Sequence, residues 1–140
     1  MPDLSSAMLV LDHVSISVPS VEIARPFYDA VMAALGVAKV YDRPDALGYG
    51  VRCTATEDFH SCLAVYQSSD ANLDSKRHWC FKATTRAQVR EFHSGGLAHG
   101  GKNDGAPGLR LQYHPHYYGA FLLDPFGNRV EAVCHRAEEV

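Results

Sequence analysis

The sequence predicts an α+β protein built from two βαβββ modules whose sheets form a curved, barrel-like cavity. Two observations support this prediction. First, the sequence repeats at an offset of 65 residues, from His13 to His78. Second, alternating apolar residues, a turn and a helical stretch follow each of these histidines in the same order. At that offset Phe27 matches Phe92 without a gap. A four-stranded sheet with a helix on one face leaves its other face uncovered, and two such sheets can enclose a cavity between those faces.

The first module, about residues 10–67, opens with a strand over 11–18, where apolar and polar residues alternate. Ser20 is a candidate N-cap for the helix that follows, and Gly36 ends that helix. Pro26 falls inside the helical pattern and predicts either a kink or a late start. Helical spacing puts six apolar residues on one face: Ile23, Phe27, Ala30, Val31, Ala34 and Leu35. Three strand candidates follow, over 38–41, 48–54 and 61–67.

The second module, about residues 77–135, repeats this order after a polar linker over 67–76. A strand over 77–83 precedes a helix that starts with a capping box, in which Thr85 is the N-cap and Gln88 reaches back. Val89, Phe92 and Leu97 form the apolar helix face. Residues 102–108 are rich in Gly, Asn, Asp and Pro and predict a loop. Strands are expected over 109–113, 117–124 and 129–134, with a tight turn over 124–128. Both modules belong to a single domain over 8–136.

The composition excludes several classes of function. The chain has 140 residues and a net charge of −3 without a basic block, so nucleic acid is not an expected partner. No apolar run approaches the ~20 residues of a membrane span, and the first residues lack the pattern of a secretory signal. The four cysteines form no CxxC pair, which favours reduced thiols over disulfides or zinc ligation. These observations together predict a cytoplasmic protein.

The histidines His13 and His78 are candidate metal ligands. Each lies at a matching point of a matching strand, on the face opposite the large apolar side chains, so both are expected to look into the cavity. A single histidine of this kind is also typical of a hydrogen-bonded sheet residue. Glu131 is the best candidate for a third ligand, because an inward carboxylate on an apolar strand is costly unless it is paired or bound to a metal. The alternative is an ion pair of Glu131 with Arg129 or Arg110.

Several polar and aromatic residues bracket the turn between two strands of the second module. Tyr113, Tyr117 and His116 are candidates for proton transfer, since imidazole and phenol groups serve as general acids and bases. Arg110 and Tyr118 are candidates for binding substrate oxygens, and Asn103 lies in a Gly-flanked segment that is a candidate anion cradle. The competing interpretations are an aromatic hairpin packed on the sheet and a plain loop.

Three sequence features resemble the vicinal oxygen chelate superfamily, the group of glyoxalases, bleomycin-resistance proteins and extradiol dioxygenases. They are the Leu-Asp-His-Val stretch at 11–14, the histidine that heads a strand at His78, and Asp-Pro-Phe-Gly-Asn-Arg-Val-Glu at 124–131. The resemblance covers roughly Val10 to His135. It implies two βαβββ modules in one chain, a substrate chelated through adjacent oxygens, and metal ligands at His13, His78 and Glu131.

The same resemblance implies a glyoxalase-like, lactoylglutathione lyase-type lyase or isomerase with one divalent metal ion, which can be Fe, Mn, Ni, Zn or Co. Glyoxalases of this group usually have a fourth ligand, a Glu on the last strand of the first module, and no carboxylate occurs around Leu63–Val65. A three-ligand site keeps two alternatives open, an extradiol-type dioxygenase and a thiol transferase. A third alternative is a metal-free module that binds a small molecule, as bleomycin-resistance relatives do. The resemblance also implies a homodimer.

Overall fold

The structure is a computed structural model that describes residues 10–52, 54–56 and 60–138. The first module contains β1 (His13–Val18), α1 (Val21–Ala34), β2 (Lys39–Arg43), β3 (Ala46–Gly50) and β4 (Cys62–Gln67). The second contains β5 (His78–Lys82), α2 (Arg86–Ala98), β6 (Lys102–Leu109), β7 (Tyr118–Leu123) and β8 (Arg129–Cys134). The order βαβββ therefore occurs twice, as predicted.

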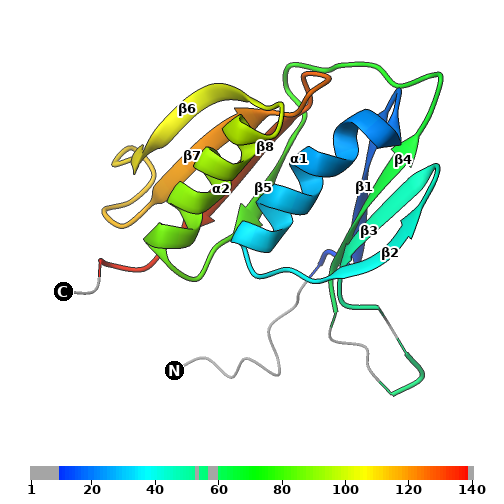
Figure 1. The fold of residues 1–140 in the computed structure, drawn as a ribbon. Helices are drawn as coiled ribbons and strands as arrows, with labels where there is room; N and C mark the ends of the chain where they lie inside the picture. Colours follow the sequence, from blue (N-terminus) through cyan, green and yellow to red (C-terminus); the bar gives the residue numbers. More distant parts are fainter. Residues whose placement is uncertain (1–9, 53, 57–59, 139–140) are drawn as a thin grey trace.

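The two modules form two four-stranded sheets with the same topology. Their strand orders are β1-β4-β3-β2 and β5-β8-β7-β6, and only the first pair of each sheet is parallel. His13 lies opposite Cys62, and His78 lies opposite Arg129 in the same register. The predicted fold class is confirmed, although the two sheets remain separate and do not close on one another within one chain (Figure 1).

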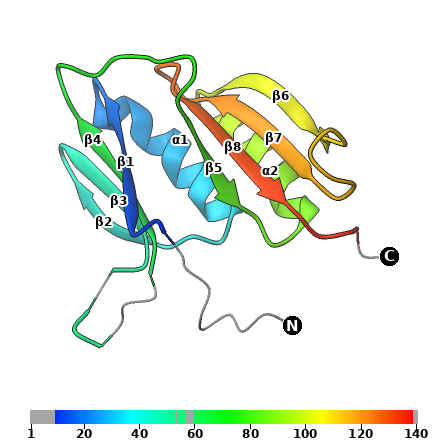
Figure 2. The same cartoon turned by 180° about the vertical axis from the view of Figure 1, so that it is seen from behind.

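The helices form one layer and the sheets the other. In Figure 1 α1 and α2 lie side by side in front of the sheets, and Figure 2 shows the opposite faces of both sheets, which no helix covers. We call these two uncovered surfaces the open faces. The helices approach each other closely at Gly96, where an added Cβ would lie 3.1 Å from Phe27 and 3.2 Å from Val31. One hydrophobic core spans both modules as a result.

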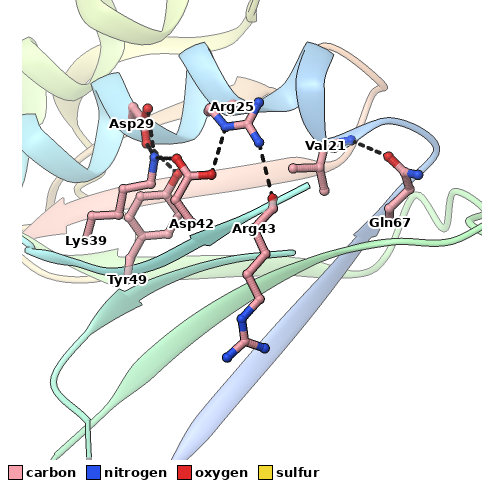
Figure 3. A network of polar contacts seen from close by, with 8 residues as sticks. All are labelled: Val21, Arg25, Asp29, Lys39, Asp42, Arg43, Tyr49 and Gln67. Atoms are coloured by element: carbon pink, nitrogen blue, oxygen red, sulfur yellow. Dashed lines mark hydrogen bonds and ion pairs between the residues drawn. The ribbon is translucent and has the colours of Figure 1, made fainter. Parts of the chain in front are cut away.

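Polar contacts attach α1 to the edge of its own sheet (Figure 3). Arg25 donates to Asp42 at 3.1 Å, and Lys39 contacts the carboxylates of both Asp29 and Asp42. The Tyr49 hydroxyl donates to Asp29 at 2.8 Å. Burial, and then the Asp29 carboxylate, raise the pKa of Tyr49, so this hydroxyl stays a donor. Since most of these side chains are partly exposed, the network orients α1 more than it stabilises the fold.

The turn over 124–128 joins the two modules. The Asp124 carboxylate, only 1% exposed, accepts hydrogen bonds from the backbone N–H groups of Phe126 and Asn128 and from the Asn128 amide. It also accepts a bond of 2.6 Å from the hydroxyl of Tyr28 on α1. The stretch of sequence that carries most of the resemblance therefore begins with a structural element, which links α1 to the second sheet.

Both helix starts agree with the predicted caps. Ser20 accepts from the N–H of Ile23 at 3.3 Å, and Thr85 accepts from the N–H of Gln88 at 3.1 Å. The Gln88 side chain reaches back to Thr84 rather than to Thr85. Pro26 lies within α1, which continues through it.

The predicted apolar faces are wrong at two positions. Ile23 is 58% exposed and Leu97 is 41% exposed, whereas Gly96 is buried. Helical periodicity locates the centre of an apolar face better than its margins, because the width of the face depends on the partner that covers it. Within the described residues, neither helix is long and apolar enough to cross a membrane.

The segment after α2 also differs from its prediction. Residues 102–108, predicted as a loop, belong to β6, and the strand predicted over 109–113 is mostly a turn. β6 is an edge strand with two irregularities in its pairing to β7, near Gly105 and Gly108. Glycine and proline are tolerated on an irregular edge strand, because only one side of it must pair. The composition of residues 102–108 is thus compatible with both a loop and an irregular edge strand, and the sequence alone favoured the loop.

Candidate functional site

The open face of the second sheet carries a buried carboxylate. Glu131 on β8 is 2% exposed and lies opposite Cys80 on β5 and Phe121 on β7. Its neighbours Val130 and Ala132 point to the opposite side of the strand, into the core. The alternation that predicted an inward Glu131 thus agrees with the structure.

Three side chains surround Glu131, two from β5 and one from the residue that precedes β7. The Tyr117 hydroxyl donates to Oε2 at 2.5 Å, and His78 Nε2 lies 3.3 Å from Oε1. The Cys80 thiol also interacts with both Glu131 and Tyr117. Gly119 leaves room for this arrangement, because a Cβ there would lie 3.2 Å from the Tyr117 ring and 3.3 Å from Glu131 Oε2. We call Glu131, His78, Tyr117 and Cys80 the Glu131 cluster.

Burial and the Glu131 charge keep protons on the neighbouring groups. Burial, and then the Glu131 carboxylate, raise the pKa of Cys80 to about 12. Burial and the hydrogen bond to Glu131 raise the pKa of Tyr117 well above its ordinary value. Both groups therefore act near neutral pH as proton-bearing donors and not as bases.

A second group of side chains lies next to the Glu131 cluster around Phe121. The Phe121 ring centre is 6.1 Å from that of His78. The guanidinium carbons of Arg129 and Arg110 lie 4.8 Å and 6.0 Å from the Phe121 ring centre. Arg129 is paired with Asp104 at 2.6 Å. Positive charge and an aromatic surface thus border the carboxylate.

His13 lies in a different environment on the first module. Its Nδ1 is 2.6 Å from Asp12 Oδ2, and His60 Nε2 is 2.8 Å from Asp12 Oδ1. The hydrogen bond with His13, aided by the His60 ring, holds the pKa of Asp12 below its ordinary value. In the described part of the chain, no three His, Cys, Asp or Glu side chains are grouped so that one chain alone could hold a metal ion. The structure brings His78 and Glu131 together and leaves His13 apart from them.

The register identifies the first-module counterpart of Glu131. Glu131 pairs with Cys80, two residues after His78, and Ala64 pairs with Ser15, two residues after His13. Ala64 therefore occupies the position of the missing carboxylate, within the segment that the sequence indicated.

The remaining candidates lie on both faces of the second sheet. Tyr113 is 62% exposed, with its ring centre 4.7 Å from that of Tyr117, and the side chain of His116 is exposed. Asn103 and Tyr118 are on the helix side. Asn103 Oδ1 is 2.9 Å from His93 Nε2 on α2, and the Tyr118 ring lies under two arginines of α2. These two residues are therefore not part of the Glu131 cluster.

Three residues near these groups were not predicted as site residues: Cys80, Phe121 and Asp12. Cys80 shares a strand face with His78, and Asp12 directly precedes His13, so each had a detectable signal. Phe121 had none, because its register against Glu131 depends on the pairing of β7 with β8.

A cavity of about 270 Å³ lies between the modules. Ser15 and Ser17 of β1 line it on one side and His78 of β5 on the other, and linker residues 70–74 and the 127–129 segment complete the wall. Its lining is largely polar, and His78 connects it to the Glu131 cluster.

Comparison with known proteins gives a consistent result for the fold. A glyoxalase/bleomycin resistance protein from Albidiferax ferrireducens T118 is 26% identical with a TM-score of 0.72, over 90% of this chain and 98% of that one. A glyoxalase/bleomycin resistance protein/dioxygenase family enzyme from Burkholderia phytofirmans PsJN is 19% identical with a TM-score of 0.64, over 89% and 98%. Lactoylglutathione lyase from Agrobacterium tumefaciens is 18% identical with a TM-score of 0.56, over 91% and 94%. No protein-family model and no curated protein sequence matches the chain.

Proposed function

From its glyoxalase/bleomycin resistance/dioxygenase fold, which confirms the resemblance to the vicinal oxygen chelate superfamily, we propose that this chain is a metal-dependent enzyme. It binds one divalent metal ion through His13, His78 and Glu131 and acts on a small substrate that presents neighbouring oxygens. The reaction is a glyoxalase-like lyase or isomerase reaction. The observation that carries the proposal is the buried Glu131 carboxylate beside His78.

The environment of Glu131 suits a cation. Among the described residues, no Lys or Arg nitrogen lies within 4.0 Å of its oxygens, and its neutral donors are a phenol and a thiol. A buried carboxylate is costly without a positive partner. An imidazole nitrogen and a carboxylate oxygen 3.3 Å apart offer two donor atoms of the types that Fe, Mn, Ni, Zn and Co accept. When bound, such an ion supplies Lewis-acid polarisation of substrate oxygens.

A homodimer would complete this site. The two open faces look to the same side of the molecule (Figure 2), so they do not face each other within one chain. In a twofold dimer, each open face of one chain can lie opposite the other open face of its partner. Such pairing would bring His13 of one chain to His78 and Glu131 of the other, which supports a dimeric site with three ligands.

The Glu131 cluster also supplies a proton donor. The raised pKa of Tyr117 keeps a proton at Oη, next to a carboxylate that can accept it. Tyr117 is therefore proposed to give its proton to a substrate oxygen, while Glu131 takes the proton that the substrate releases and then returns it to Tyr117. Tyr113, whose ring is tilted against that of Tyr117, and the exposed His116 are proposed to act at the edge of the site.

Metal analysis and sedimentation test this proposal together. We expect one metal ion per chain and a dimer for the wild type. His13→Ala, His78→Ala and Glu131→Gln should each weaken metal binding by more than the roughly 10–100-fold that loss of an outer-shell partner costs. His99→Ala is the matched control, because His99 is an exposed histidine that contacts only the end of α2.

The absence of stoichiometric metal in wild-type protein prepared under metal-replete conditions would overturn the proposal. It would favour a second candidate, a metal-free module that binds a small molecule. One observation supports that candidate: Tyr117 and His78 contact both oxygens of Glu131, so side chains of the chain itself provide partners for this carboxylate. A monomer that binds one metal ion would refute only the dimeric arrangement.

A further inference from the structure

We propose that Arg110 recognises an oxyanion, a carboxylate or phosphate group, on the substrate of the open face of the second module. This inference deepens the proposed function by naming a substrate class. It depends on the proposed function only in taking that face as the ligand site. Four observations support it: the seat of the guanidinium, its free donors, its lack of a counter-charge and its place beside Phe121.

Two backbone carbonyls and two glycines of β6 hold the Arg110 guanidinium in a fixed position, which we call its seat. Nη1 donates to the carbonyl of Gly108 at 3.0 Å, and Nη2 donates to the carbonyl of Ala106 at 2.8 Å. A Cβ at Gly108 would lie 3.2 Å from Nη1, and one at Gly105 would lie 3.4 Å from Nη2. The irregular course of β6 and its two glycines therefore hold the guanidinium in one place, which reduces the entropy lost when it binds a ligand.

The seated guanidinium keeps most of its binding capacity. A guanidinium has five N–H donors, and the two carbonyls occupy two of them. Within the described residues, no carboxylate oxygen lies within 4.0 Å of Arg110. Arg129 is different, because its guanidinium over the same ring is paired with Asp104 at 2.6 Å. Arg110 is thus the uncompensated positive charge at Phe121.

The position of Arg110 relates it to the Glu131 cluster. Its guanidinium carbon is 6.0 Å from the Phe121 ring centre, and that ring centre is 6.1 Å from that of His78. Phe121 also lies opposite Glu131 in the sheet. An oxyanion on Arg110 would therefore be separated from the His78 and Glu131 donors by the width of the Phe121 ring.

These features define the chemistry of the ligand. The planar guanidinium pairs with carboxylate or phosphate through two parallel hydrogen bonds. A flat apolar portion can pack on Phe121. The expected substrate is a small anion whose oxyanion end binds Arg110 and whose other oxygens reach His78 and Glu131.

Ligand titrations followed by NMR test this inference on the full chain without added metal. The probes are benzoate, phenylphosphonate and the neutral benzamide. We expect both anions, but not benzamide, to shift the signals of the Arg110 side chain and of Phe121. Arg110→Met should weaken anion binding at least about tenfold, the loss that one charge-assisted hydrogen bond of about 1.5–3 kcal/mol predicts. Arg110→Lys should bind the anions with an affinity between those of the wild type and Arg110→Met, because an ammonium group cannot make two parallel hydrogen bonds to one oxyanion.

Arg90→Met is the matched control, since Arg90 is an exposed arginine over Tyr118 on the helix side. Unchanged anion binding in Arg110→Met, or equal binding of benzamide, would overturn the inference. Preference for one of the two anions identifies the carboxylate or the phosphate as the group recognised. Glu131→Gln separates the two proposals, because it should abolish metal binding and leave benzoate binding to Arg110 intact.

Discussion

The contact between the two helices provides a sharp test of the packing. Gly95 and Gly96 are consecutive residues of α2, yet an alanine is expected to have opposite effects at the two positions. At Gly96 a Cβ would lie 2.3 Å from Leu122 Cδ1, with Phe27 and Val31 also closer than ordinary contact. At Gly95 the nearest atoms belong to Ala30, at 3.8 and 3.9 Å, which is ordinary contact.

The magnitudes follow from two opposing effects. Replacing a helical glycine by alanine favours the helix by about 1 kcal/mol. Overpacking a core costs about 1–3 kcal/mol. The upper end applies at Gly96, because Leu122 is fully buried and has no free direction in which to move. Gly96→Ala should therefore lower the free energy of unfolding by about 2 kcal/mol, and Gly95→Ala should raise it by about 0.5–1 kcal/mol.

Urea unfolding measures both variants. The single tryptophan, Trp79, is half-buried against the core and reports on tertiary structure, while circular dichroism reports on the helices. Coincident transitions would justify a two-state analysis. The melting temperature should fall by about 4–8 °C for Gly96→Ala. A Gly96→Ala protein as stable as the wild type would refute the close helix contact. A Gly95→Ala protein that is less stable than the wild type would also refute it.

Two further predictions concern the hydroxyl groups of Tyr28 and Tyr49 and the thiol group of Cys80. Tyr28→Phe removes a donor to the buried Asp124 carboxylate and should cost about 1.5–3 kcal/mol in urea unfolding. Tyr49→Phe should cost less, because the carboxylate it contacts is half exposed; equal losses would contradict the junction role of the turn. With its pKa raised to about 12, Cys80 should react with iodoacetamide at pH 8 far more slowly than an ordinary thiol, and Glu131→Gln should accelerate the reaction. The unfolded thiol ionises near 9.0, so the stability from this group is complete below that pH and declines as pH rises toward 12; rapid wild-type labelling would contradict this assignment.

The sequence patterns predicted most of the local structure. Alternation located β1, β5 and β8, and Ser20 and Thr85 were correctly predicted as caps. The sequence predicted a loop where β6 forms, because glycine and proline are typical of loops. In β6 these residues lie on an irregular edge strand, and two of its glycines lie against the Arg110 guanidinium.

The candidate site was predictable in part. The inward position of Glu131 and its neighbourhood with His78 follow from strand alternation and the parallel pairing of β5 with β8. The placement of Asn103 and Tyr118 on the helix side did not follow, since a shift of one residue in register moves a side chain to the other face. The free charge of Arg110 was equally hidden, because it depends on which carboxylate pairs with Arg129.

The sequence by itself determined that there are two equivalent modules, that His13 and His78 lie on the faces away from the helices, and that only the second module has a carboxylate in its last strand. The tertiary structure decided how the modules sit together. The two helices pack side by side and Tyr28 bonds to Asp124, so both open faces look the same way and His13 is separated from Glu131 within one chain. Periodicity is a property of neighbouring residues, whereas the placement of modules depends on contacts between side chains far apart in the sequence.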